Sequence, residues 1–152
     1  MRPHPLVFPA LAALLASCAD PFGTLSSGLR PPDIKATTVF FTRISGIDPF
    51  QWIDTLPAGE DVMVMVQEKC AGEFPLYRVV VTANADTVYD LQEGCSGGGE
   101  GSSAGGRSWT PPGPGVYRFT AVLDADDQFA ETDETNNTAT GTLVVLGRSI
   151  SP

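Results

Sequence analysis

The feature that most constrains the fold is an alternation of apolar and polar side chains with a period of two residues. Residues 61–68 show it plainly, since Val62, Val64 and Val66 share one side and more polar or flexible residues share the other. A period of two is the period of a β-strand whose one face lies on a core. We therefore expect strands wherever this pattern recurs.

The same pattern, with an enrichment in β-branched and aromatic residues, recurs along the chain and no segment after the N-terminus shows helical periodicity. The expected strands are 34–42, 61–68, 76–83, 87–91, 116–123 and 138–145. Short strands separated by turn residues over about 100 residues are typical of an antiparallel β-sandwich. The fold class predicted is therefore all-β, with about seven strands.

The last two expected strands give the clearest assignment of faces. In residues 116–123, the side chains of Tyr117, Phe119, Ala121 and Leu123 are expected to point inward. Residues 138–145 alternate in the same way, and a polar connection joins the two segments. We expect the pair to form a hairpin.

The N-terminus has the layout of a signal for export. Residues 6–16 form an uncharged apolar run that is too short for a membrane-spanning helix, which needs about 20 residues. The run ends in Leu15-Ala16-Ser17-Cys18, which resembles the lipobox of bacterial lipoproteins. An ordinary signal peptide that happens to contain a cysteine is the alternative.

The lipobox resemblance implies a signal peptide over 1–17 and lipidation of Cys18, hence a chain anchored in the cell envelope. The outer membrane is the expected location, with the protein facing the periplasm or the cell surface. Residues 18–31 are rich in Gly, Ser and Pro and are expected to be a flexible tether. The domain is expected over 32–147 and a disordered tail over 148–152.

The charge and the histidine content exclude several classes of function. The chain carries 9 basic and 18 acidic residues, a net charge of −9, which disfavours binding to nucleic acid phosphates. Its one histidine, His4, lies in the expected signal peptide. Catalytic triads and zinc sites that need histidine are therefore excluded from the mature chain, whereas a hydrolase with two carboxylates passes this filter.

Two cysteines, Cys70 and Cys95, remain if Cys18 is lipidated. In an exported chain such a pair is expected to form a disulfide; the alternative is a reactive thiol or half of a metal site.

The glycine-rich segment 94–108 is expected to be a mobile surface loop. Phe50, Trp52 and Trp109 are candidates for an exposed binding patch or for ordinary packing.

A longer motif lies between the last two strands. Asp124, Phe129, Glu131, Glu134, Asn136 and Asn137 resemble the C-terminal signature of CARDB, the "cell adhesion related domain found in bacteria". Pro32-Asp33-Ile34 resembles the start of that domain, and Lys69-Cys70-Ala71-Gly72 departs from the Asn-x-Gly turn that the family often has. The resemblance spans about residues 32–146. It implies an immunoglobulin-like sandwich that serves as an accessory module of surface proteins, without catalysis.

The acidic motif permits two interpretations. Its side chains could accept hydrogen bonds from backbone amides and so serve the fold. Alternatively, hard oxygen ligands at short spacing could bind Ca²⁺, and the candidates are Asp124, Asp126, Glu131, Asp133 and Glu134.

We expect a binding, adhesion or spacer module that is not an enzyme and needs no cofactor, with a calcium-stabilised structural module as the alternative. The expected partners are the membrane, through the lipid on Cys18, and an unidentified protein or glycan.

Overall fold

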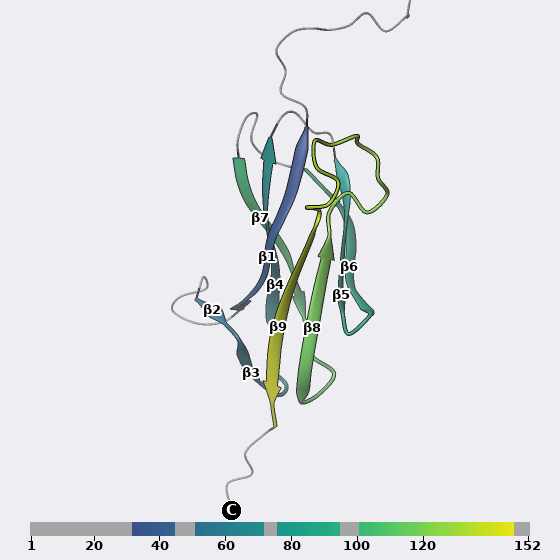
Figure 1. The fold of residues 1–152 in the computed structure, drawn as a ribbon. Helices are drawn as coiled ribbons and strands as arrows, with labels where there is room; N and C mark the ends of the chain where they lie inside the picture. Colours follow the sequence, from purple (N-terminus) through teal and green to yellow (C-terminus); the bar gives the residue numbers. More distant parts are fainter. Residues whose placement is uncertain (1–31, 45–50, 72–75, 95–100, 148–152) are drawn as a thin grey trace, which may run out of the picture.

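The computed structural model describes residues 32–44, 51–71, 76–94 and 101–147, with only the backbone described at 101–104. Within these residues every regular element is a β-strand, and the strands form two sheets packed face to face (Figure 1). The predicted fold class, an all-β sandwich of immunoglobulin type, is confirmed.

The first sheet has four strands in the order β2-β1-β4-β7. Its members are β2 (Trp52–Ile53), β1 (Asp33–Arg43), β4 (Val62–Ala71) and β7 (Gly101–Trp109). The second sheet has the order β3-β9-β8-β5-β6. Its members are β3 (Thr55–Pro57), β9 (Thr138–Leu146), β8 (Gly115–Val122), β5 (Tyr77–Ala83) and β6 (Asp86–Glu93).

The pairings are antiparallel, except that β3 runs parallel to β9. The expected hairpin of the last two strands is confirmed by the β8–β9 register from Gly115↔Val145 to Val122↔Thr138. The short strands β2 and β3, before residue 60, are not among the strands expected from the sequence. Strands of two and three residues are too short to show an alternation.

The expected loop over 94–108 also needs correction. From Gly101 onward this segment is strand β7, which pairs with β4 along its length from Cys70↔Gly101 to Val62↔Trp109. The glycines of β7 let neighbouring strands and side chains approach closely. A Cβ on Gly106 would lie 2.4 Å from the sulfur of Met65, and one on Gly105 would lie 2.3 Å from a carboxylate oxygen of Glu93. The glycines of this segment are therefore explained by tight packing in a strand, and the prediction of a mobile loop from the glycine content was wrong for residues 101–108.

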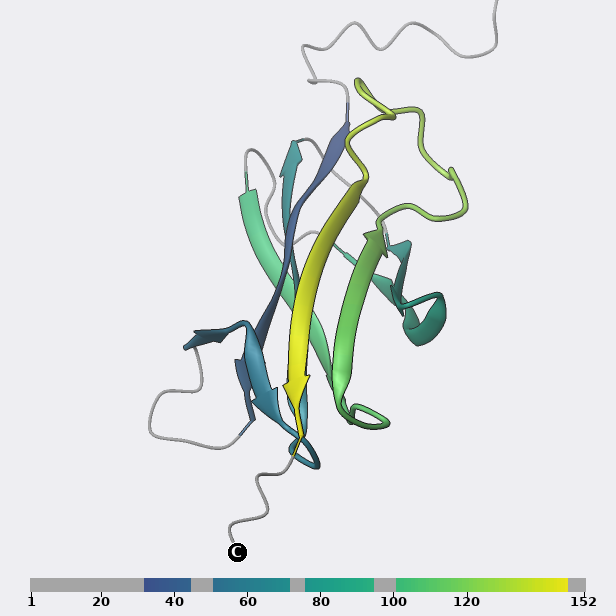
Figure 2. The same ribbon diagram turned by 60° about the horizontal axis from the view of Figure 1, so that its bottom comes forward.

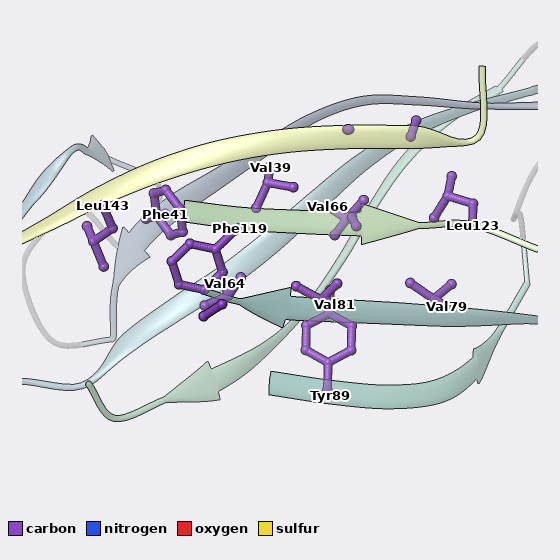
Figure 3. Close-up of a cluster of buried hydrophobic side chains, with 14 of the residues drawn as sticks. Val39, Phe41, Val64, Val66, Val79, Val81, Tyr89, Phe119, Leu123 and Leu143 are labelled. Carbon is purple, nitrogen blue, oxygen red and sulfur yellow. The ribbon is translucent and has the colours of Figure 1, made fainter. Parts of the chain in front are cut away.

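The core lies between the sheets (Figure 3). It includes Phe119, Ala121 and Leu123, which were expected to point inward, whereas Tyr117 is only partly buried against it. Val62, Val64 and Val66 of β4 are buried in the same cluster as Val79 and Val81 of β5. Phe41 and Phe119 pack with ring centroids 4.8 Å apart and so join the two sheets. Burial of these side chains supplies the main driving force for the fold.

The sandwich is closed along one side by β1 and β9, which lie side by side in both views (Figures 1 and 2). At Gly141 of β9 a Cβ would lie 2.5 Å from the carbonyl oxygen of Val39. Because no side chain fits there, glycine lets the two sheets approach each other at this point.

Candidate functional site

The acidic motif forms the loop between β8 and β9, at the end of the sandwich where β1 begins (Figure 2). The loop is closed at its neck by a hydrogen bond from the Leu123 amide to the Asn137 carbonyl, 2.9 Å. Asp124 and Asp127 both have positive φ, 45° and 52°, a conformation that aspartate adopts more readily than most residues. The backbone conformation therefore explains in part why aspartate occupies positions 124 and 127.

Asp124 organises the first half of the loop. Its side chain is buried, with 5 % of the residue exposed. One carboxylate oxygen accepts a hydrogen bond from the Gln128 amide at 3.1 Å, and the other accepts one from the Phe129 amide at 3.0 Å. Its own carbonyl accepts from the Asp127 amide at 2.8 Å. The carboxylate therefore holds a tight turn by satisfying amides that would otherwise lack partners.

Glu131 connects the loop to the first strand. One of its carboxylate oxygens accepts a hydrogen bond from the Ile34 amide in β1, and the other accepts one from the side-chain amide of Asn137 at 2.8 Å. Burial raises the pKa of Glu131, against the opposing effect of these two donors. The glutamate thus bridges residues almost a hundred positions apart in the sequence.

Glu134 and Asp133 serve shorter connections. The Glu134 carboxylate accepts from the Glu131 amide at 2.6 Å. One oxygen of Asp133 accepts from both the amide and the hydroxyl of Thr135, at 3.0 and 2.6 Å. These hydrogen bonds hold the pKa of Asp133 below its ordinary value. Both residues therefore act within the loop.

Asn136 and Thr132 hold the start of β1 from the other side. The Asn136 side chain donates to the Asp33 carboxylate at 3.1 Å, and its carbonyl accepts from the Ala36 amide at 3.0 Å. The Thr132 amide donates to the Pro32 carbonyl at 3.0 Å. Together with Glu131, these contacts clamp the entry of the chain into the sandwich.

Arg78 ties the loop to the second sheet. Its guanidinium makes a two-pronged contact with Asp90, at 2.7 and 2.6 Å, and a further contact with Asp126 at 2.6 Å. The contact with Arg78 lowers the pKa of Asp90. All three side chains are well exposed, so this network contributes modestly to stability. It does, however, fix where Asp126 points.

The five calcium candidates are consequently not gathered into one cage. Asp124, Glu131, Asp133 and Glu134 accept hydrogen bonds from N–H or O–H groups, and Asp126 contacts a guanidinium. Among the described residues no group of three or more histidine, cysteine, aspartate or glutamate side chains could hold a metal ion.

A second cluster of acids, which the sequence interpretation missed, lies between the sheets. Glu68 of β4 is buried, with 3 % exposed, and accepts a hydrogen bond from the Tyr77 hydroxyl. Burial raises the pKa of Glu93 on β6, and the charge of Glu68 raises it further. Residue 68 has the same parity as Val62, Val64 and Val66, so the alternation did contain the signal for an inward glutamate.

The aromatic candidates fall into different classes. Trp109 is half-buried and packs edge-on against Tyr117 and Phe119, with centroids 5.0 and 5.1 Å away, which is ordinary core packing. Trp52 is 62 % exposed and stacks on Phe40 with the centroids 4.7 Å apart and the rings 24° from parallel. Phe50 lies outside the described residues.

The remaining predicted sites concern the exported state. Cys18, the signal peptide over 1–17, the tether over 18–31 and Cys95 lie outside the described residues. Cys70 is buried at the end of β4 and pairs in register with Gly101, six positions after Cys95. The Cys70–Cys95 disulfide stays a prediction. In the part of the chain that the structure covers, no helix is long and apolar enough to cross a membrane.

Comparisons with known proteins agree with this geometry. The CARDB family model matches residues 78–141, which run from β5 to β9 and include the acidic loop. The fold is similar to the CARDB domain of a Pyrococcus furiosus protein crystallised in complex with di-metal ions. The TM-score is 0.59 and the identity 23 %, and the match covers 78 % of this chain and 96 % of that one.

The solution NMR structure of the same Pyrococcus furiosus domain matches equally, with a TM-score of 0.59, 24 % identity, and coverage of 78 % and 98 %. No curated protein matches. The resemblance seen in the sequence is thereby confirmed: residues 78–141 match the CARDB family model, and the sandwich has the fold of the CARDB domain structures.

Proposed function

We propose that this protein is a non-enzymatic lipoprotein of the cell envelope whose CARDB domain serves as a binding or adhesion module. A CARDB domain, as a cell adhesion related domain, fits a binding or adhesion module. The observation that carries the proposal is the use of the acidic motif, whose side chains are engaged in hydrogen bonds that hold the loop and β1. Because the side chains of the motif serve the fold, we infer that binding uses other parts of the domain surface.

The anchoring part rests on the lipobox resemblance of Leu15-Ala16-Ser17-Cys18. A lipoprotein anchor carries more than one acyl chain, and this matters because a single chain holds a protein at a membrane only marginally. The start of β1 at Asp33 would then lie 15 residues after the anchor, which leaves room for the domain to stand away from the bilayer.

Growth of expressing bacteria with a tagged fatty acid tests this. We expect the wild-type protein to carry the label and to fractionate with membranes, and Cys18→Ala to lose both properties. Cys70→Ala serves as the matched control, because that thiol is not in the lipobox. An unlabelled wild-type protein would reject the anchoring.

A calcium-stabilised module is the second candidate, and one observation favours it. The side-chain oxygens of Asn136 and Asn137 are buried and accept no hydrogen bond within the described residues, and the similar Pyrococcus furiosus domain was crystallised with di-metal ions. Against it, the candidate carboxylates already accept hydrogen bonds. We expect the melting temperature to be the same in millimolar Ca²⁺ and in EDTA. A calcium-dependent rise that is lost in Asp124→Ala would favour the second candidate.

A further inference from the structure

The outward face of the β2-β1-β4-β7 sheet differs in character from the rest of this acidic chain. We define it by side chains that alternate with the core: Asp33, Lys35, Thr38, Phe40 and Thr42 of β1, Met63, Met65, Gln67 and Lys69 of β4, and Trp52 of β2. Thr42, which pairs with Trp52, is itself buried. The chain has twice as many acidic as basic residues, yet one acid, Asp33, stands among these outward positions, at the start of β1.

One end of the face is a stacked aromatic platform. Trp52 is 62 % exposed and rests on Phe40, which pairs across the strands with Met65. The next strand adds no side chain over Met65, because Gly106 stands opposite it in β7. The exposed apolar surface at this end of the face is therefore centred on the indole ring of Trp52.

The other end of the face carries two positive charges. Lys35 and Lys69 are exposed and directly opposite each other in the antiparallel β1–β4 pair. Like charges in this arrangement are destabilising. Among the described residues neither lysine forms an ion pair, although Lys35 is close enough to contribute to the low pKa of Asp133. A bound anion would neutralise the two positive charges and so remove the repulsion between Lys35 and Lys69.

The acids at the borders of the face are already engaged. Asp33 accepts a hydrogen bond from Asn136, and Asp61 accepts one from the Thr110 hydroxyl at 2.6 Å. Between the two ends lie Thr38 and Gln67, paired across the strands, which offer a hydroxyl and an amide. The lysine row and the Trp52 row are seven residues apart along β1, on the order of 20 Å.

We propose that this face docks an extended anionic polysaccharide. A sugar ring would stack on Trp52, hydroxyls would meet the Thr38–Gln67 row, and an acidic group would bind between Lys35 and Lys69. A protein partner is less well matched, because a specific protein interface buries about 800 Å² on each side around a sizeable apolar core. Here the exposed apolar surface is centred on one ring. Because the chain is acidic overall, it repels an anionic polymer at long range, and the attraction is confined to the two lysines of this face at short range.

This inference rests on the proposed binding role and is tested on the purified protein with polygalacturonate as the probe. Affinity electrophoresis measures binding, and a change in tryptophan fluorescence that is absent from Trp52→Phe, which keeps Trp109, reports its site. We expect retardation by polygalacturonate but not by neutral dextran. Trp52→Ala should weaken binding about tenfold or more, the loss expected for a stacked ring, while Trp52→Phe should retain most of it. Lys35→Gln with Lys69→Gln should weaken binding at low salt and remove its salt dependence.

Val116→Ala is the matched control, since Val116 is 55 % exposed on the other sheet, and it should bind as the wild type does. Equal melting temperatures of Trp52→Ala and wild type would show that the fold is intact. Binding to polyglutamate as strong as to polygalacturonate would point to an acidic protein and would overturn the proposal, as would wild-type affinity in Trp52→Ala. A fatty-acid-labelled protein that ignores polygalacturonate rejects this inference alone, whereas an unlabelled protein that binds it rejects only the anchoring.

Discussion

Substitution of Glu131 by alanine should destabilise the domain strongly, although the residue lies in a loop. The change removes the acceptor of the Ile34 amide, in a residue with no exposed surface, and the acceptor of the Asn137 side chain. A buried polar group left without a partner costs about 1–3 kcal/mol. Two such groups, one of them within reach of water, give a loss of about 2–4 kcal/mol in the free energy of unfolding.

Urea denaturation followed by far-UV circular dichroism measures this loss. Glu134→Ala is the matched control, because its carboxylate accepts one hydrogen bond, from the Glu131 amide, within the described residues and lies at the surface. We expect the control to lose about 0.5–1.5 kcal/mol, the net value of one hydrogen bond. Glu131→Gln should fall between the two, since its amide nitrogen cannot accept. If Glu131→Ala loses no more than Glu134→Ala, the loop does not clamp β1 and the reasoning is refuted.

Three further predictions concern the core, the buried acids and the cysteine pair. Phe119→Ala should lower the free energy of unfolding by about 3–5 kcal/mol, because the ring has no exposed surface and packs on Phe41; a urea midpoint near that of the wild type would contradict its place in the core. Glu93→Gln should raise stability at pH 7, because burial raises the pKa of Glu93 in the folded state and ionisation therefore costs folding energy. That advantage should fade as the pH falls towards about 4.5 and be absent below it, where the carboxyl is protonated in both states. A gain that is independent of pH would show that the charge is not its cause. Alkylation of the natively folded exported protein should find no reactive thiol at Cys70 or Cys95, and two modified thiols would exclude the disulfide.

The parts of the fold that could be predicted are those in which burial alone decides the pattern. The inward residues Val64, Val81 and Phe119 follow from a period of two, since each strand presents one face to a single core. Strand β7 could not be predicted in this way. Its order comes from pairing with β4, and its glycines at 105 and 106 are required by neighbouring side chains that the local sequence does not show.

The candidate site was likewise predictable only where the local sequence carries the signal. The motif residues were found from their spacing, and so was the interpretation that they accept hydrogen bonds from amides. Their partners were not, because Asp33, Ile34 and Arg78 lie far from the loop in the sequence, and only the folded sandwich brings them to Asn136, Glu131 and Asp126. Glu68 was overlooked because a charged residue at the end of a strand is usually taken as solvated.

The clamp on β1 also determines how the domain would respond to a pulling force. The described chain enters at Asp33 and leaves at Gly147, at opposite ends of the sandwich (Figure 1). Tension between these ends acts along β1, whose hydrogen bonds to β4 run across the direction of pull and span the register from Asp33↔Ala71 to Arg43↔Val62. The bonds are therefore loaded together in shear instead of opening one at a time. The Ile34–Glu131 and Ala36–Asn136 contacts pass part of that load to the second sheet. A domain held by its N-terminus and pulled from its far end would thus resist extension.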